Sequence, residues 1–371
     1  MKCRSSRRNG RIGVLPARQM AVSVVAAVAS LLGAAAAQAE TVYKVTELLI
    51  GPKSDVTLYS NGKAINKSGK TAIEYGYSVS GFAAARCAKA VCTQIPELQV
   101  RSFPATTPGG INDLGHVTGS SFSGFTTHAF LWNGTQTIDL GGLPDDGCGG
   151  CMLDSFGRDV NNKGHVVGMA YNIEGSARAF LYKDAQMRDI GTLGGEFSDA
   201  YALNEKGDIV GVSTLSGGAQ RAYVYRAGVM TNLGTLGGSH SAAYGVNDLR
   251  QVVGCSTTPG DTEQRGFIHQ AGAMAALPSL GGNESCAFGI NRNGWVVGYS
   301  SDPVSSDPRG VLWQPGGPVI DLNARLDAKT GKNWVITEAR AINDNGLIVA
   351  TGEHKGTTRA ALLTPIVVGD Q

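Results

Sequence analysis

The sequence predicts an all-β protein: a seven-bladed β-propeller of four-stranded antiparallel blades, closed by pairing of its N- and C-terminal strands. Three observations predict this fold. A short unit that begins with Asn recurs seven times at near-regular spacing, short alternating or β-branched segments surround each copy, and no segment has a sustained helical period. Residues 40–371 are expected to form one propeller domain, preceded by a leader at residues 1–39.

The recurring unit is Asn, two further residues, usually Gly, one residue, and then β-branched residues. Asn hydrogen-bonds the backbone two residues on, and Gly takes the left-handed conformation that a four-residue hairpin loop with a bulge requires. The spacings are 46, 49, 43, 43, 44 and 52 residues, close to the length of one propeller blade. The copies begin at Asn66, Asn112, Asn161, Asn204, Asn247, Asn291 and Asn343.

Each repeat contains four candidate strands. In the fourth copy the first is the alternating segment 200–203, and the second is the β-branched segment 209–212. The third is the aromatic segment 221–225, and the fourth is the Gly-rich segment 231–238. Four short antiparallel strands per repeat make one blade.

The two ends of the array complement each other. The seventh repeat starts at Ala339, runs through three strands to Leu363, and lacks a fourth. The segment Val42–Leu49 resembles that missing strand, so we expect it beside Arg359–Leu363, where it would close the ring. An open solenoid would instead need polar capping repeats at both ends.

The leader has the pattern of a cleaved signal peptide. A basic stretch without acidic residues precedes an apolar run, 20–37, which ends in the cleavage-like sequence Ala37-Gln38-Ala39. A transmembrane anchor is the alternative, but the Ala- and Gly-rich run favours cleavage. Arg7 and Arg8 suggest twin-arginine export, whereas the polar Asn9 and the Gly after it favour the general secretion route.

Cleavage would reverse the sign of the net charge. The whole chain carries +2, with a pI near 8.1. Six of its 32 basic residues lie in the leader, which leaves 26 against 30 acidic residues, a net charge of −4. Nucleic acid and anionic membranes are therefore not the expected partners, and no second apolar run of spanning length follows.

The repeat motifs resemble those of the bacterial HAF-repeat extracellular proteins. The resemblance rests on segment 128–132 (His-Ala-Phe-Leu-Trp), segment 189–195 (Asp-Ile-Gly-Thr-Leu-Gly-Gly) and the Asn units, and it covers the whole mature chain. It implies a bacterial protein exported to the periplasm or beyond, but no defined activity and no catalytic residues. The chain departs from the pattern at 86–90, which replaces an aromatic strand, and at Arg250, where Gly is expected.

Six cysteines remain after Cys3 leaves with the leader, an even number that predicts disulfides in an oxidising compartment. Two pairs are close in sequence, and the third follows by elimination. A redox motif or half a metal site is the alternative for Cys-Gly-Gly-Cys, although the sequence around it favours a loop staple. The expected pairs are Cys87 with Cys92, Cys148 with Cys151, and Cys255 with Cys286.

Four long inserts interrupt the repeats, at 144–154, 257–264, 301–308 and 323–334. They belong to the two loop classes that emerge on one face of a four-stranded meander, where binding residues usually lie. Their acids suit calcium or a polar ligand, although solvated loop acids are the commoner outcome and the spacing matches no calcium loop. The candidate ligand-binding residues are Asp145, Asp146, Asp154, Asp261, Asp327 and Trp334.

A cation opens the third strand of every repeat. A collar for an anionic ligand is one interpretation. We favour a framework role, in which each cation bonds carbonyls of the adjacent Gly-rich linker, because a framework residue should recur in every copy. The seven are Arg86, His128, Arg178, Arg221, Arg265, Arg309 and Arg359.

These features favour a secreted or periplasmic recognition protein that binds a glycan, peptide or protein partner on its loop face. The sequence contains no H-E-x-x-H, G-x-S-x-G, P-loop or EF-hand motif, so it predicts no catalytic residue, no metal and no cofactor. One alternative is a hydrolase or lyase that uses Asp145, Asp146 or Asp327. The other is a purely structural envelope or matrix protein, for which no pocket is expected.

Overall fold

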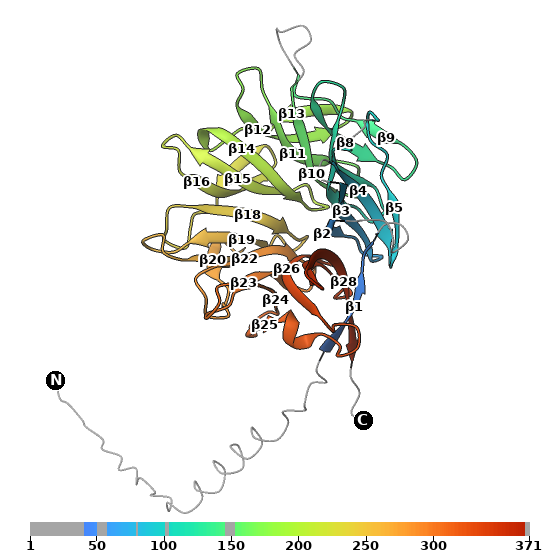
Figure 1. Ribbon diagram of the computed structural model, residues 1–371. Coiled ribbons are helices and arrows are strands. Elements are labelled where there is room, and N and C mark those ends of the chain that lie inside the picture. Colours follow the sequence, from blue (N-terminus) through green and yellow to red (C-terminus); the bar gives the residue numbers. More distant parts are fainter. Residues whose placement is uncertain (1–40, 50–57, 79–80, 101–103, 145–152, 368–371) are drawn as a thin grey trace, which may run out of the picture. The chain divides into compact units, whose positions relative to one another are not determined.

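Seven four-stranded antiparallel sheets follow one another around a common centre in the computed structural model (Figure 1). The structure describes residues 41–49, 58–78, 81–100, 104–144 and 153–367. The seven blades belong to one compact unit, Thr41–Ile366. The predicted seven-bladed propeller is therefore confirmed.

The blades are numbered here in chain order, and each runs from an inner first strand to an outer fourth strand. Blade 1 comprises β2 (Tyr59–Ile65), β3 (Lys70–Ser78), β4 (Gly81–Ala88) and β5 (Val91–Gln94). Blade 2 comprises β6 (Thr106–Ile111), β7 (Val117–Phe122), β8 (Thr127–Trp132) and β9 (Thr137–Asp139). Blade 3 comprises β10 (Ser155–Val160), β11 (Val166–Tyr171), β12 (Ala177–Lys183) and β13 (Gln186–Asp189). Blade 4 comprises β14 (Gly194–Leu203), β15 (Ile209–Leu215), β16 (Gln220–Arg226) and β17 (Val229–Asn232).

The last three blades follow the same order. Blade 5 comprises β18 (Ser241–Val246), β19 (Val252–Thr257), β20 (Gln264–Gln270) and β21 (Ala273–Ala276). Blade 6 comprises β22 (Ser285–Ile290), β23 (Val296–Ser301), β24 (Pro308–Trp313) and β25 (Val319–Asp321), followed by the short 3-10 helix η1 (Leu322–Arg325). Blade 7 comprises β26 (Trp334–Ile342), β27 (Ile348–His354), β28 (Thr357–Val367) and β1 (Thr41–Glu47).

The N-terminal strand closes the ring. β1 lies beside β28, so blade 7 takes its outer strand from the beginning of the chain and its other three from the end (Figure 1). Tyr43, Val45 and Leu48 are buried, and the Leu48 amide donates to the carbonyl of Ala360 at 2.9 Å. The predicted latch is confirmed.

Each Asn unit forms the hairpin between the first two strands of its blade. The side-chain oxygen of Asn204 accepts the amides of Lys206 and Asp208, at 3.0 and 2.9 Å. The turn is completed by the backbone bond from Gly207 to the carbonyl of Asn204, and Gly207 has φ +85°. A left-handed residue at this point is the reason for the repeated glycine.

The glycine of the second strand has a packing role. A Cβ on Gly168 would lie 1.9 Å from the carbonyl oxygen of Phe156 and 2.9 Å from the ring of Phe180. Phe180 is fully buried, as are Phe130 and Phe267 on the third strands of their blades. The missing Cβ therefore lets the first and second strands approach closely. It also leaves space for the aromatic side chains that pack between blades.

Two of the three expected disulfides lie among the described residues, and both form. Cys87 and Cys92 join the adjacent strands β4 and β5, with a sulfur–sulfur distance of 2.01 Å. Cys255 and Cys286 join β19 of blade 5 to β22 of blade 6. Cys148 and the rest of 145–152 lie outside the described residues, as does the leader at 1–39.

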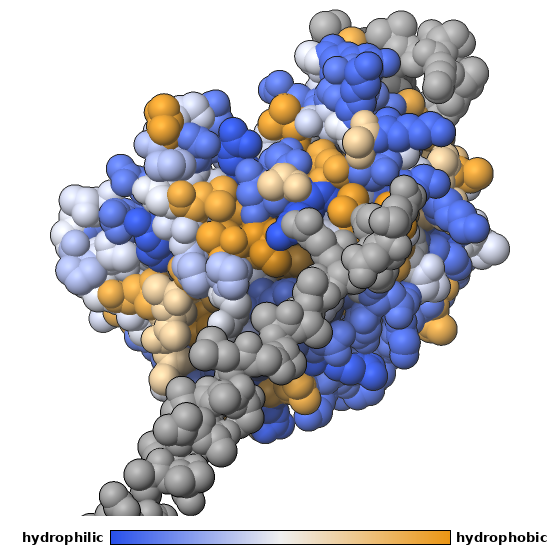
Figure 2. Space-filling view, turned by 90° about the horizontal axis from the view of Figure 1, so that it is seen from below, coloured by the Kyte–Doolittle hydropathy of each residue, from blue (hydrophilic) through white to orange (hydrophobic). Residues whose placement is uncertain are grey.

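The surface of the described unit is mixed in character. Large hydrophobic residues that are exposed include Val100, Phe125 and Val304. On the face seen in Figure 2, hydrophobic residues lie in groups among hydrophilic ones. Within the described parts of the chain, no helix is long and apolar enough to span a membrane.

Candidate functional site

The seven turn asparagines form a closed ring of hydrogen bonds around the centre of the propeller. Each side-chain Nδ2 donates to the backbone carbonyl oxygen of the corresponding Asn in the next blade, at 2.9–3.4 Å. The last bond runs from Asn343 to Asn66 and joins blade 7 to blade 1, at 3.1 Å. The repeated Asn therefore forms the turn and also fastens each blade to its neighbour.

These bonds occupy most of the hydrogen-bonding groups of the seven side-chain amides, so few remain for a ligand. In each turn the Oδ1 atom accepts backbone amides, and the Nδ2 atom donates across the blade boundary, as for Asn247. All seven side chains are buried. A buried amide whose oxygen and nitrogen are both bonded within the protein is a framework group.

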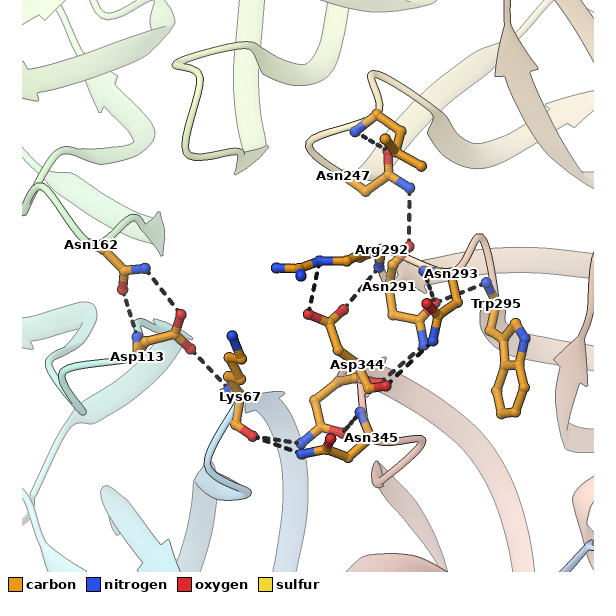
Figure 3. Close-up of polar contacts among 12 residues, drawn as sticks. Lys67, Asp113, Asn162, Asn247, Asn291, Arg292, Asn293, Trp295, Asp344 and Asn345 are labelled. Atoms are coloured by element: carbon orange, nitrogen blue, oxygen red, sulfur yellow. Dashed lines mark hydrogen bonds and ion pairs between the residues drawn. The ribbon is translucent and has the colours of Figure 1, made fainter.

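A cavity of about 340 Å³ opens at the level of this ring, and we call it the central mouth. Three layers of side chains line it: an apolar residue before each Asn, the Asn itself, and the residue after it. The last layer forms the rim, part of which Figure 3 shows. The rim residues are Lys67, Asp113, Asn162, Glu205, Asp248, Arg292 and Asp344.

The rim side chains also bond from blade to blade. Asp113 accepts the amide of Lys67 at 2.9 Å, and Asn162 accepts the amide of Asp113 at 2.7 Å (Figure 3). Glu205 accepts the amide of Asn162 at 2.8 Å, and Asp248 accepts that of Glu205 at 3.0 Å. The rim therefore stabilises the ring at these boundaries.

At two blade boundaries this type of bond between rim residues is missing, because the rim residue of the next blade is a cation. Arg292 and Lys67 follow Asp248 and Asp344 around the rim, and their side chains carry no hydrogen-bond acceptor. Arg292 instead pairs with Asp344, which accepts the Arg292 amide at 2.9 Å and forms an ion pair with its Nε at 3.4 Å (Figure 3). The rim is therefore uneven in charge, with four acids and two bases.

Asp159 is the one ionisable residue in the mouth that lies below the rim, since the same position in the other blades holds Ala or Gly. Its carboxylate accepts the amide of Val160 at 2.8 Å and that of Leu203, in the next blade, at 3.1 Å. Burial raises the pKa of Asp159 to about 7, although these bonds oppose the shift and Glu205 adds to it. Gly110 leaves the space for this side chain, because a Cβ there would lie 2.2 Å from Oδ1.

A β-bulge recurs in every inner strand just before the mouth. In six blades the register shifts at the residue three positions before the Asn, as at Tyr201 between Ala200 and Ala202, and in blade 2 the shift covers 109–110. Bulges redirect side chains and are common beside binding sites. The residues at this position are Lys63, Gly109, Arg158, Tyr201, Tyr244, Phe288 and Arg340.

Five of these residues contact one another in succession and form what we call the inner arc: Arg158, Tyr201, Tyr244, Phe288 and Arg340. The rings of Tyr201 and Tyr244 stack with centroids 4.9 Å apart, and Tyr244 meets Phe288 edge to face at 5.6 Å. The guanidinium of Arg340 lies 4.4 Å from the Phe288 ring, and that of Arg158 lies 6.0 Å from the Tyr201 ring. The arc is therefore three aromatic rings with an arginine at each end.

Acidic side chains hold both arginines in place. Asp199 pairs with Arg158 at 3.0 Å, and Glu338 pairs with Arg340 at 2.5 Å. Burial raises the pKa of Asp199, while the adjacent Arg158 opposes that rise. Burial also raises the pKa of Tyr244, so its hydroxyl is protonated at neutral pH. At that pH the arc presents neutral, partly exposed rings between positioned cations.

The described insert residues that were expected to bind ligand make contacts within the protein. Asp154 accepts the amide of Thr127 at 2.7 Å, and Asp261 accepts that of Ser239 at 2.7 Å. Asp327 accepts the amide and the hydroxyl of Thr330, both at 2.8 Å. Trp334 stacks on His354, with centroids 4.6 Å apart.

Hydrogen bonds lower the pKa of two of these carboxylates, Asp261 and Asp327. Bonds from Thr257 and Ser239 hold the pKa of Asp261 at about 2. Asp145 and Asp146 lie outside the described residues. Nowhere in the described segments do three His, Cys, Asp or Glu side chains gather in a way that could hold a metal ion.

The cations of the third strand have different partners in different blades. Arg221 and Arg265 donate to carbonyls of the linker to the next blade, at Ser239 and Asn283, as the framework interpretation expects. His128, Arg309 and Arg359 instead pair with Asp139, Asp302 and Glu47, whereas the buried Nε of Arg178 has no hydrogen-bond partner.

Arg86 does not occupy the expected position in its blade. Ala83 pairs with Tyr75 as Arg178 pairs with Ala170, so Ala83 is the equivalent residue. Arg86 lies three residues further along β4. Its guanidinium stacks over Trp132 at 4.5 Å and donates to the carbonyl of Gly115, in a turn of blade 2.

Sequence analysis alone missed the inner arc and Asp159. The signal for both was present at fixed offsets from the repeated Asn: an arginine or aromatic residue lies three positions before it in five repeats, and an aspartate lies two positions before Asn161. The bulge hides it, because an inserted residue breaks the alternation from which side-chain direction is predicted.

No protein-family model and no curated protein sequence matches this chain. The chain is similar to a puromycin-hydrolysing peptidase of Mycobacterium tuberculosis, with a TM-score of 0.54, 11% identity, and coverage of 86% of this chain and 50% of the peptidase. It is also similar to the propeller domain of the trilobed protease of Pyrococcus furiosus, which has an open velcro topology, with a TM-score of 0.52, 8% identity, and coverage of 84% and 98%. TolB of Acinetobacter baumannii aligns with a TM-score of 0.42, 13% identity, and coverage of 87% of this chain and 63% of TolB. The chain thus spans less than two thirds of TolB and half of the peptidase, and the likeness shows the propeller fold alone.

Proposed function

We propose that this protein is an exported recognition propeller that binds a glycan, peptide or protein partner at the centre of its ring. One observation carries the proposal. The repeat position at the bulge of the inner strand bears, in successive blades, three contacting aromatic rings between two arginines. The repeated asparagines beside it use their side chains for bonds within the propeller.

The composition of the inner arc suits such ligands. Aromatic faces stack on the apolar faces of sugars and on peptide side chains, and they lose little conformational entropy on binding. Arg158 and Arg340 present donors in a fixed fork beside these faces. The adjacent central mouth, with a volume of about 340 Å³, supports recognition over a purely structural role.

Export is part of the proposal. The leader pattern at 1–39 supports it, and so do the two disulfides at Cys87–Cys92 and Cys255–Cys286, because such bonds persist in oxidising compartments. The resemblance to bacterial HAF-repeat extracellular proteins suggests the same location, in the periplasm or outside the cell.

Glycan and peptide arrays probed with the purified protein test the proposal. We expect saturable binding that Tyr244→Ala weakens at least tenfold, while Phe125→Ala, which removes an aromatic ring that is 82% exposed between β7 and β8, leaves it unchanged. Tyr244→Phe keeps the ring and should keep most of the affinity. Absence of any saturable ligand, or equal binding by Tyr244→Ala, would refute the proposal.

A further inference from the structure

A second cavity lies between blades 4 and 5, away from the inner arc. Its volume is about 240 Å³, and residues of the hairpin β18–β19 and of the third strands β16 and β20 line it. It is on the side of the propeller that carries the Asn turns. The lining residues are Val224, Arg226, Leu249, Arg250, Val252, His269, Gln270, Ala271 and Gly272.

Asp208 holds two arginines at this cavity. Its side chain is 5% exposed, and its carboxylate lies 3.0 Å from Nε of Arg226 and 3.3 Å from Nε of Arg250. The Arg226 contact is an ion pair without hydrogen-bond alignment, since that buried Nε lacks a hydrogen-bond partner. Asn204 also donates to Asp208, at 3.2 Å.

Both guanidinium groups are therefore engaged through their inner nitrogen. No hydrogen bond among the described residues engages the outer Nη atoms of Arg226 or Arg250, whose side chains are 36% and 56% exposed. A guanidinium fork with free outer donors is suited to bidentate binding of a planar or tetrahedral oxyanion. Two arginines against one carboxylate leave a net positive charge.

Arg250 departs from the repeat in a way the turn does not require. The other six turns have Gly at this position, each with positive φ, and Arg250 adopts the same left-handed conformation with φ +65°. A side chain with a Cβ is strained there, and such strain is concentrated at functional sites. Because the turn itself favours Gly, the arginine at this position is explained by the contacts of its side chain.

The remaining walls limit the ligand. Val224 and Val252 are apolar, while burial and the adjacent Arg226 lower the pKa of His269, so that it is a neutral hydrogen-bonding group at neutral pH. The volume is below the range of about 300–1,000 Å³ typical of sites for drug-sized ligands. A compact molecule of monosaccharide size fits these limits.

We infer that this cavity is a second binding site, in which Arg226 and Arg250 clamp the carboxylate or phosphate group of a small molecule. The site does not depend on the inner arc or on the function proposed for it.

Calorimetric titration at low ionic strength tests the inference, with glucuronate, glucose 6-phosphate and neutral glucose as probes. We expect at least one anionic sugar to bind saturably and glucose to give no saturable heat. The comparison between the two anions identifies which oxyanion the site takes. Failure of both anions to bind would overturn the inference.

Arg250→Gly supplies the decisive variant, because it restores the residue of the other six turns. We expect it to keep or raise the melting temperature and to weaken anion binding at least tenfold. Arg226→Gln should weaken binding similarly, whereas Arg188→Gln, at an exposed position of β13, should not change it. Binding by Arg250→Gly equal to that of the parent would overturn the inference. Tyr244→Ala should keep anion binding, which separates this site from the inner arc.

Discussion

The side-chain amide of Asn343 donates to the backbone carbonyl of Asn66, across 277 residues of sequence, at 3.1 Å. This bond is the seventh of a set that is otherwise made between neighbouring repeats. It joins the two ends of the array through a side chain at the inner strands. The pairing of β1 with β28 joins them through backbone hydrogen bonds at the outer strands.

Removing one amide of the ring should destabilise the protein more than removing a similar turn amide elsewhere. Asn204→Ala deletes two acceptor contacts and the bonds to Asn247 and Asp208, and we expect a loss of about 2–4 kcal/mol in the free energy of unfolding. Asn172 is the matched control, since its Oδ1 caps a turn through Glu174 and Ser176 but its side chain makes no bond to another blade. Chemical denaturation of both variants measures the difference, and equal losses would contradict a fastening role for the ring.

The buried face of β1 should carry the stability of the latch. Tyr43→Ala empties a fully buried position, so we expect a loss of about 3–5 kcal/mol, whereas Lys44→Ala on the exposed face should change stability by less than about 0.5 kcal/mol. Tyr43→Phe should be neutral or stabilising, because the buried hydroxyl has no hydrogen-bond partner. Thermal and chemical unfolding test the three variants, and an unaffected Tyr43→Ala would mean that β1 does not close the ring in solution.

Ionisation of Asp159 should lower the stability as the pH rises from about 4 to about 7. Its pKa is raised from 3.8 to about 7 in the native state, so over this range the native protein binds more protons than the unfolded chain. The resulting loss in the free energy of unfolding is absent below pH 4 and complete above pH 7. It is at most about 4 kcal/mol, at about 1.4 kcal/mol per pKa unit.

Asp159→Asn should flatten this pH dependence and unfold at higher denaturant concentration than the parent at pH 8. Denaturation at several pH values measures the difference between the two proteins, which cancels the contribution of Asp199. A carboxyl resonance of Asp159 that titrates near pH 4 in NMR spectra would contradict the prediction.

The disulfide between blades should contribute more than the one within a hairpin. Cys255 and Cys286 are 31 residues apart, and closing a loop of that length restricts the unfolded chain by about 3–4 kcal/mol, against about 2 kcal/mol for the separation of five between Cys87 and Cys92. Paired Cys→Ala variants of each bridge, compared by chemical denaturation, give the two values. The reverse order would indicate that unfolded-state entropy does not govern these bonds.

The repeat made most of the fold predictable. A turn signal with a local physical cause, Asn followed in six of the seven copies by a left-handed Gly, located seven hairpins and hence the first two strands of every blade. The orphan segment at Val42–Leu49 then identified the closing strand, because a blade that lacks one strand needs a partner. Arg86 was misplaced because the first repeat has alanine where the others have a cation.

The candidate site was harder to predict because its geometry is not local. The contact between Tyr201 and Tyr244 joins residues of neighbouring blades, and each of them lies at the bulge of its inner strand. An Asn that satisfies its own turn also gives no indication in sequence that its Nδ2 reaches the next blade. Both contacts depend on how neighbouring blades are placed around the centre of the propeller.

The join between the last blade and the first also has a consequence for biogenesis. Among the propeller strands β1 is synthesised first and its partner β28 last, so ring closure is the most non-local pairing in the fold and must wait until the last blade has been made. Until then the outer edge of β28 has unpaired backbone groups, which invite pairing with another molecule. Newly made chains should therefore need protection from aggregation at this edge until β1 docks.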